Sequence, residues 1–340
     1  MRNSLIYIAL VVLGIACENN QKNKCAFIPN TKETKISFTY QSLESELAHI
    51  KSKTQLESFL DKHPILADNF FYRNQFPSNS VFIEELYHRF TNIYIDTLFM
   101  EVKKTFGDGQ ELKTRFENAF KNVKYYFSTF QPPVVQTIIS GLETDMYVSD
   151  TVVVIGLDFY IGSEARFKPN MYSYMQRRYN KDFIVPSVLL LMGIDSRLNK
   201  IDPNDKTVLA EMIAYGKAYY FAKQMIPCTA DSIFIGYTAE EINGAKEYES
   251  LIWSRLIEDQ VLFSTSHLVK QKYLEERPKT LEIGDKCPGR IGTWVGWQIV
   301  KKYMDNHPDV TLSQLMAMSN SSLIFSDSQY KPQFIPLAKK

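Results

Sequence analysis

The sequence predicts an α+β fold that is mainly helical, with a small central β-sheet, in one large domain. Apolar residues recur at intervals of three and four along most of the chain, which is the spacing of amphipathic helices. Two β-branched segments, residues 134–140 and 151–161, are bounded by turn residues and predict strands near the middle of the chain. No repeat with a period of about 20 to 50 residues is visible, which argues against a repeat protein.

Helical patterns flank the two predicted strands on both sides. The predicted helices comprise residues 43–63, 81–106 (one or two helices), 111–127, 169–179, 205–225, 239–258, 288–304 and 312–318. Just before the last of these, Thr311 and Gln314 have the spacing of a capping box, in which two residues satisfy backbone N–H groups reciprocally.

Residues 1–16 have the features of a lipoprotein signal peptide. Arg2 supplies a positive charge, and an uncharged run of twelve residues extends from residue 5 to residue 16. As a helix, this run would be about 18 Å long, too short for a bilayer core of about 30 Å. Cys17 follows Gly14 and Ala16, which resembles a lipoprotein box whose cysteine is acylated, and ordinary secretory cleavage is the alternative. Two or more acyl chains on Cys17 would hold the protein on a membrane.

The rest of the chain divides into a polar leader and a globular part. Residues 17–35 are polar and lack apolar periodicity, which predicts a flexible tether, and residues 36–340 are predicted to form the globular domain. The formal net charge of +1 gives no nucleic-acid signature, so no nucleic-acid partner is expected. The sequence predicts neither a cofactor nor a metal.

Three cysteines remain once Cys17 is set aside. The cell envelope permits disulfides, and of the possible bridges Cys228–Cys287 is the expected pair, which would leave Cys25 free. Three unpaired thiols are the alternative. Their spacing does not fit a zinc site.

Three glycines of the segment 287–304 predict a close-packing face. At about 100° per residue, Gly289, Gly292 and Gly296 lie within an arc about 60° wide on a helix. Each glycine in a helix costs about 1 kcal/mol relative to alanine, so three on one face indicate that another backbone must approach closely.

The opposite face of this segment is a candidate interaction face. Arg290, Trp294, Trp297 and Lys301 share an arc, and the spacing of Arg290 and Trp294 allows cation–π stacking. A partner-binding patch is one interpretation of this face, and a half-buried structural cluster is the other.

The predicted strand 151–161 and helix 205–225 loosely follow the layout of zinc peptidases, in which an edge strand and a helix with the pattern HExxH form the site. Glu211 would stand at the position of the general base, but Ala210 and Ala214 occupy the ligand positions. We therefore expect no enzyme and interpret Glu211 as an exposed helix carboxylate. A degenerate zinc-peptidase-like layout is kept as an alternative.

One further charge needs an explanation. Asp158 lies among strand-like apolar residues, where a carboxylate requires a partner. An ion pair with Arg166, Arg177 or Arg178 is the expected arrangement.

Four segments together resemble one family. They are PGRIGTWVGWQIVKKYM (288–304), EMIAYGKAYYF (211–221), IGYTAEEI (235–242) and GLDFYIG (156–162), and they resemble the GldB family of gliding-motility lipoproteins of Bacteroidetes. Lys286-Cys287 before Pro288 is a minor departure from that pattern.

The resemblance implies a lipoprotein of the cell envelope that is needed for gliding and works with the associated secretion machinery. It supplies no catalytic residues. We therefore expect a binding or scaffold component whose partners are other gliding and secretion proteins. Its lipid anchor would lie in the inner or the outer membrane, with the body facing the periplasm. A hydrolase, or the relic of one, acting on envelope peptides or polysaccharide is the alternative.

Overall fold

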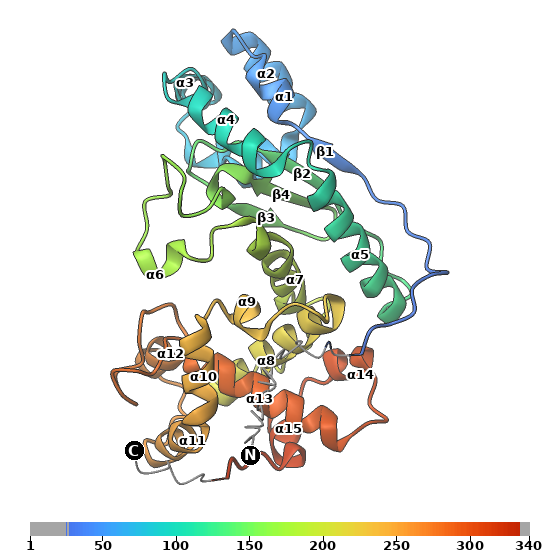
Figure 1. Ribbon diagram of the computed structural model, residues 1–340, viewed down its shortest axis with the longest axis vertical. Helices are drawn as coiled ribbons and strands as arrows, with labels where there is room; N and C mark the ends of the chain where they lie inside the picture. Colours follow the sequence, from blue (N-terminus) through green and yellow to red (C-terminus); the bar gives the residue numbers. More distant parts are fainter. Residues whose placement is uncertain (1–24, 26, 334–340) are drawn as a thin grey trace, which may run out of the picture.

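The structure is a computed structural model that describes residue 25 and residues 27–333 of the chain. The predicted signal peptide, Cys17 and residues 18–24 lie outside the described residues. In Figure 1 the sheet and helices α1 to α5 form the upper half of the molecule, and helices α7 to α15 form the lower half.

The sheet has four strands in the order β1-β2-β4-β3. The strands are β1 (Tyr40–Ser42), β2 (Val134–Ile138), β3 (Met146–Val148) and β4 (Val152–Gly156). β2 pairs in parallel with both β1 and β4, so that Val135 lies opposite Tyr40 on one side and Val153 on the other, and β3 is antiparallel to β4. The two predicted strands are thus the central ones.

The interior position of β4 differs from the zinc-peptidase layout considered above. All five residues of β4 are buried, and β3 forms the sheet edge beside it. After Gly156 the chain turns into a 3-10 helix, Leu157–Tyr160, rather than continuing as a strand to residue 161. The predicted strand 151–161 is therefore shorter and cannot act as an edge strand.

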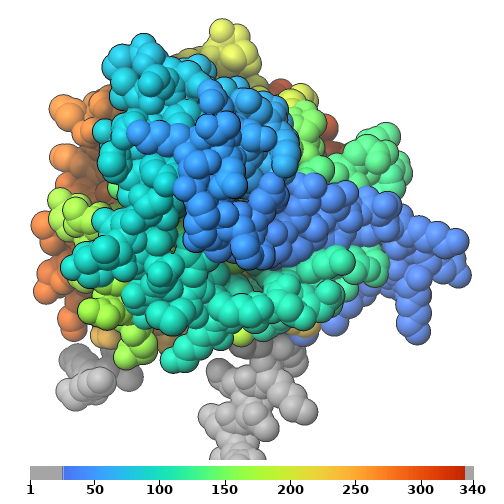
Figure 2. Space-filling model, turned by 90° about the horizontal axis from the view of Figure 1, so that it is seen from above, coloured from blue at the N-terminus to red at the C-terminus, as the bar shows by residue number. Residues whose placement is uncertain are grey.

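Five α-helices belong to the same half of the molecule as the sheet. They are α1 (Glu44–Ala48), α2 (Lys53–Lys62), α3 (Asn79–Phe90), α4 (Ile95–Phe106) and α5 (Gln110–Tyr126), with a π-helical turn at Leu66–Phe70 and a 3-10 turn at Arg73–Gln75. The predicted helix 43–63 is divided because Ser52 adopts an extended conformation and its side chain accepts the Gln55 N–H as the cap of α2. Figure 2 looks onto this end of the molecule, where the residues coloured blue to teal form most of the near surface.

The remaining helices form the lower half. They are α6 (Ser173–Gln176), α7 (Ile184–Ile194), α8 (Val208–Met225), α9 (Asp231–Ile235), α10 (Ala239–Glu247), α11 (Glu249–Glu258), α12 (His267–Tyr273), α13 (Ile291–Asn306), α14 (Leu312–Ala317) and α15 (Ser321–Ser328), with a 3-10 turn at Lys181–Phe183. The capping box of Thr311 and Gln314 is present at α14.

The predicted helix 169–179 is wrong for most of its length, because only the four residues of α6 are helical. The side-chain amide of Gln176 donates to the carbonyl oxygens of Pro169 and Met171, which fixes a non-helical path before α6.

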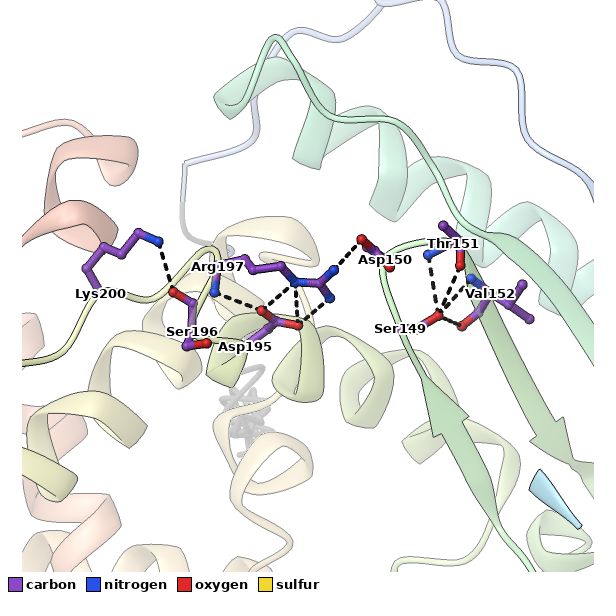
Figure 3. A network of polar contacts seen from close by, with 8 residues as sticks. All are labelled: Ser149, Asp150, Thr151, Val152, Asp195, Ser196, Arg197 and Lys200. Atoms are coloured by element: carbon purple, nitrogen blue, oxygen red, sulfur yellow. Dashed lines mark hydrogen bonds and ion pairs between the residues drawn. The ribbon is translucent and has the colours of Figure 1, made fainter. Parts of the chain in front are cut away.

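A polar network joins the two halves at the turn between β3 and β4 (Figure 3). The Ser149 hydroxyl accepts the N–H of Val152 and donates to its carbonyl oxygen, which closes the turn. Arg197, in the segment after α7, forms ion pairs with Asp150 in that turn and with Asp195, where Arg197 Nη2 lies 2.6 Å from Oδ2. The sheet half is thus linked directly to the connection between α7 and α8.

Candidate functional site

The glycine-rich face of α13 packs directly against the backbone of α8. A Cβ atom on Gly296 would overlap the carbonyl oxygen of Met212, and one on Gly216 of α8 would overlap the carbonyl oxygen of Gly296. The two helices therefore meet at glycines on both sides, without intervening side chains. This close approach explains why the chain accepts the cost of glycine within two helices.

The other two glycines contact different neighbours. A Cβ on Gly292 would lie 3.0 Å from the Tyr273 carbonyl oxygen and 2.8 Å from Leu274 Cδ2, at the end of α12. Gly289 lies before the helix, which begins at Ile291 rather than at residue 288, and a Cβ there would overlap the Arg277 carbonyl oxygen. The three glycines are all close-packed, but they do not form a single helical stripe.

The tryptophans of the candidate interaction face are buried, so the partner-patch interpretation is wrong for them. Trp294 is 1% exposed and Trp297 is 0% exposed. The Trp297 ring stacks on Tyr219 of α8 with centroids 5.2 Å apart, and Phe234 of α9 contacts it edge-on. Neighbouring helices cover both faces of α13, and the structural-cluster interpretation therefore holds.

The two charged residues of that face anchor opposite ends of α13. Arg290 donates to the carbonyl oxygen of Ile235 and pairs with Glu276, with 3.4 Å between Nε and Oε2. Arg290 has a positive φ of 58°, which places it just before the helix. At the far end, Lys301 Nζ lies 2.8 Å from Asp231 Oδ2 and 3.9 Å from the centre of the Trp297 ring. A cation–π contact is thus present at Lys301 rather than at Arg290.

The Lys301 ion pair is shared with a second lysine. Lys223 of α8 lies 3.2 Å from Asp231 Oδ1. Burial raises the pKa of Asp231, but Lys301 and Lys223 outweigh this effect and hold the pKa below its usual value. Both lysines are thereby engaged in holding α8, α9 and α13 together.

Glu211 lies in the first turn of α8 and is ion-paired. Lys270 Nζ of α12 lies 2.5 Å from its Oε1, and the Glu211 side chain is 43% exposed. Within the described part of the chain, no group of three or more His, Cys, Asp or Glu side chains has an arrangement that could hold a metal ion. Glu211 is thus a partly exposed helix carboxylate that joins α8 to α12.

The prediction that Asp158 forms an ion pair with an arginine is wrong. Asp158 is fully buried, and its carboxylate accepts the N–H of Ser140 at 2.8 Å and the N–H of Leu142 at 2.6 Å. Burial raises its pKa, against the lowering effect of these hydrogen bonds. Backbone N–H groups can partner a buried carboxylate as a cation does, and the sequence pattern does not reveal them.

Of the three arginines expected near Asp158, Arg177 pairs with Glu241 and Arg178 with Glu276. Arg166 lies over the ring of Phe167, with 5.4 Å between its Cζ and the ring centre.

The expected Cys228–Cys287 disulfide is also wrong, because Cys228 pairs with Cys25 across 203 residues of sequence. Cys287 is a free, buried thiol, and burial raises its pKa to about 12. Part of the predicted tether is thereby fixed to the body at Cys25. Sequence spacing carried no signal for this pairing, since the two cysteines meet only when the leader folds back along the domain.

One surface feature was missed by sequence reasoning, a groove of about 630 Å³ beside α11 and α12. We call it the α11–α12 groove, and its lining includes Ile257, Asp259, Leu262, Phe263 and Val269. Ile257 is 48% exposed, and Phe263 and the neighbouring Leu268 are each 67% exposed. Large apolar side chains that gather at a surface are typical of interaction sites. Periodicity could not reveal the groove, because it does not show which apolar residues remain uncovered.

The model of a family described as gliding motility protein GldB matches residues 24–332. No curated protein and no solved structure matches the chain.

Proposed function

The chain belongs to the GldB family of gliding motility proteins, and from this premise we propose that it is a lipid-anchored envelope protein that binds other components of the gliding and secretion machinery. In this proposal the protein acts by binding its partners and not as an enzyme, and it needs neither a metal nor another cofactor. The family match over residues 24–332 carries the gliding assignment.

Acylation of Cys17 would provide the membrane attachment. The cysteine follows a short apolar segment with small residues, as expected for a lipoprotein. Among the described residues no helix has both the length and the apolar character to cross a bilayer. We propose that the anchor lies in the inner or the outer membrane and that the body faces the periplasm.

The α11–α12 groove is the surface that best supports a binding role. Exposed Phe263 and Leu268 would lose contact with water when a partner covers them, which contributes about 25 cal/mol for each Å² of apolar surface buried. Asp259 is the one charged residue in the lining. A complementary partner from the gliding or secretion machinery would present apolar side chains beside a lysine or an arginine.

Crosslinking in gliding cells tests the binding role. A photo-crosslinking amino acid in place of Phe263 should capture a specific envelope protein. The same amino acid in place of Ile93, which is 81% exposed between α3 and α4, is the matched control and should not capture that protein. Equal labelling at both positions, or no product at Phe263 in cells that glide, would contradict this surface.

The hydrolase alternative has its own measurement. Stoichiometric zinc in the purified protein would favour a peptidase-like site over a binding component. We expect none, because alanines stand at positions 210 and 214 and Glu211 is paired with Lys270.

A further inference from the structure

The N-terminal segment enters the folded body at two separate places. The Cys25–Cys228 disulfide fixes it to the loop between α8, which ends at Met225, and α9, which begins at Asp231. The second attachment is the sheet, where β1 begins at Tyr40. In Figure 1 the segment between these two places runs along the outside of α5, from the sheet down to the lower half.

Few interactions hold the stretch between the disulfide and the sheet. Ile36 is the first of its large apolar side chains to pack against the core, followed by Phe38, whose ring lies edge-on to Phe120. Nearer the disulfide, Pro29 is buried but Phe27 and Ile28 are 65% and 60% exposed. The described hydrogen bonds of residues 30–34 are local to that segment. Among the described residues, the disulfide is therefore the strong attachment nearest the N-terminus.

This attachment sets how far the body can lie from residue 17. Cys17 and Cys25 are eight residues apart (25 − 17), so their Cα atoms can be separated by at most about 28 Å at about 3.5 Å per residue. Without the disulfide, the first buried residue of the described chain, Pro29, is twelve residues from Cys17 (29 − 17), which allows about 42 Å, and Ile36 is nineteen residues from Cys17 (36 − 17), which allows about 65 Å.

We propose that the Cys25–Cys228 disulfide limits the length of the linker between the lipid anchor and the body, and so holds the helical half of the body close to a lipid bilayer. We call this role a length stop. The inference rests on the acylation of Cys17 proposed above. A pull on the anchor then passes from Cys25 directly to Cys228, three residues after the end of α8, a helix whose side chains lie largely in the core. Without the bond, the same pull would act on the few contacts of residues 29–38 and then on β1, an edge strand of three residues.

Energy transfer from the native tryptophans to dansyl-labelled lipid measures the separation. Trp253, Trp294 and Trp297 are the only tryptophans, and all lie in α11 and α13 of the helical half. The purified full-length acylated protein is reconstituted in phosphatidylethanolamine–phosphatidylglycerol vesicles. The wild type should give strong transfer, and the Cys25→Ser/Cys228→Ser variant should give transfer at least twofold weaker.

Two insertions keep the disulfide and serve as a matched pair. Twelve Gly/Ser residues inserted between Lys24 and Cys25 lengthen the path to the anchor and should weaken transfer as the double variant does. The same insertion between exposed Lys32 and Glu33 lies inside the loop closed by the disulfide and should leave transfer unchanged. Unchanged tryptophan emission in the absence of dansyl lipid shows that each variant is folded.

The outcomes separate this inference from the proposed function. Equal transfer in all vesicle-bound variants would overturn the length stop while leaving the lipid anchor intact. A wild-type chain that fails to float with the vesicles would overturn the anchor and the length stop together.

Discussion

Lys217 of α8 is a buried charge without a carboxylate partner among the described residues. It is 1% exposed, and its Nζ donates to the carbonyl oxygens of Lys200 at 2.6 Å and Met318 at 2.7 Å. Burial lowers its pKa to about 8. The side chain thus joins the segment after α7 to the segment after α14, but its ammonium form is less favourable in the folded than in the unfolded chain.

The pH dependence of stability tests this account of Lys217. The unfolded chain holds the Lys217 proton more tightly than the folded chain does. The free-energy cost of burying the ammonium group is therefore complete below pH 8, and it decreases as pH rises toward 10.5 because the folded chain loses this proton first. Relative to Lys217→Met, the wild type should gain up to about 3 kcal/mol of unfolding free energy between pH 7 and pH 10. Urea unfolding at both pH values measures the difference. A difference that does not vary with pH would contradict a lowered pKa.

Asp158 is the second buried charge, and it organises the turn after β2. Its carboxylate oxygens accept hydrogen bonds from the backbone N–H groups of Ser140 and Leu142. Leu142 has a positive φ of 63°. Asp158→Ala would leave these N–H groups without an acceptor and should lower the unfolding free energy by about 2–4 kcal/mol. Denaturant unfolding measures this loss. A loss below about 0.5 kcal/mol would show that the turn does not depend on the carboxylate.

At the scale of elements, the crossing of α8 and α13 depends on glycine. Gly296→Ala gains about 1 kcal/mol of helix propensity but places a Cβ against the Met212 carbonyl, so we expect a net loss of about 1–3 kcal/mol. Gly244→Ala in α10 is the matched control, because a Cβ there meets nothing within 4 Å. It should stabilise the protein by up to about 1 kcal/mol. If the melting temperatures of both variants changed in the same direction, this would contradict the close approach of α13 to α8 at Gly296.

Local patterns predicted the elements that carry their own signal. The central strands β2 and β4, the helices α5, α8 and α13, and the capped start of α14 all follow from periodicity, β-branching or capping residues. α7 was missed because its sequence, IVPSVLLLMGI, is apolar on nearly every side and shows no helical period. β1 and β3 have three residues each and are defined by their pairing with neighbouring strands, which no short sequence pattern reveals.

Properties that depend on distant segments were the least predictable. The spacing predicted that Trp294 and Trp297 lie opposite the glycines, but Trp297 stacks on Tyr219 of α8, the helix that also contacts Gly296, and the spacing could not show that both tryptophans are buried. Cys228 has its partner 203 residues away, and Asp158 is bound by backbone groups of another segment. The α11–α12 groove was missed for the same reason, since the exposure of a side chain depends on the whole folded chain.

At the scale of the whole molecule, the linkages differ greatly in strength. The ion pair of Arg197 with Asp150 joins the halves at an exposed site, since these side chains are 56% and 62% exposed (Figure 3). Exposed ion pairs contribute little to stability. The Cys25–Cys228 bond is covalent and connects the leader to the helical half. The disulfide, rather than the surface ion pair, is therefore suited to resist force applied through a membrane anchor.

Spreading on agar by a deletion strain tests the membrane-anchored role in gliding most directly. The strain should not spread, and the wild-type chain should restore spreading. Cys17→Ala, produced at the same level, should fail to restore it because the body is no longer held at the membrane. Spreading of the deletion strain like its parent would contradict the role in gliding, and full restoration by Cys17→Ala would contradict the need for a lipid anchor.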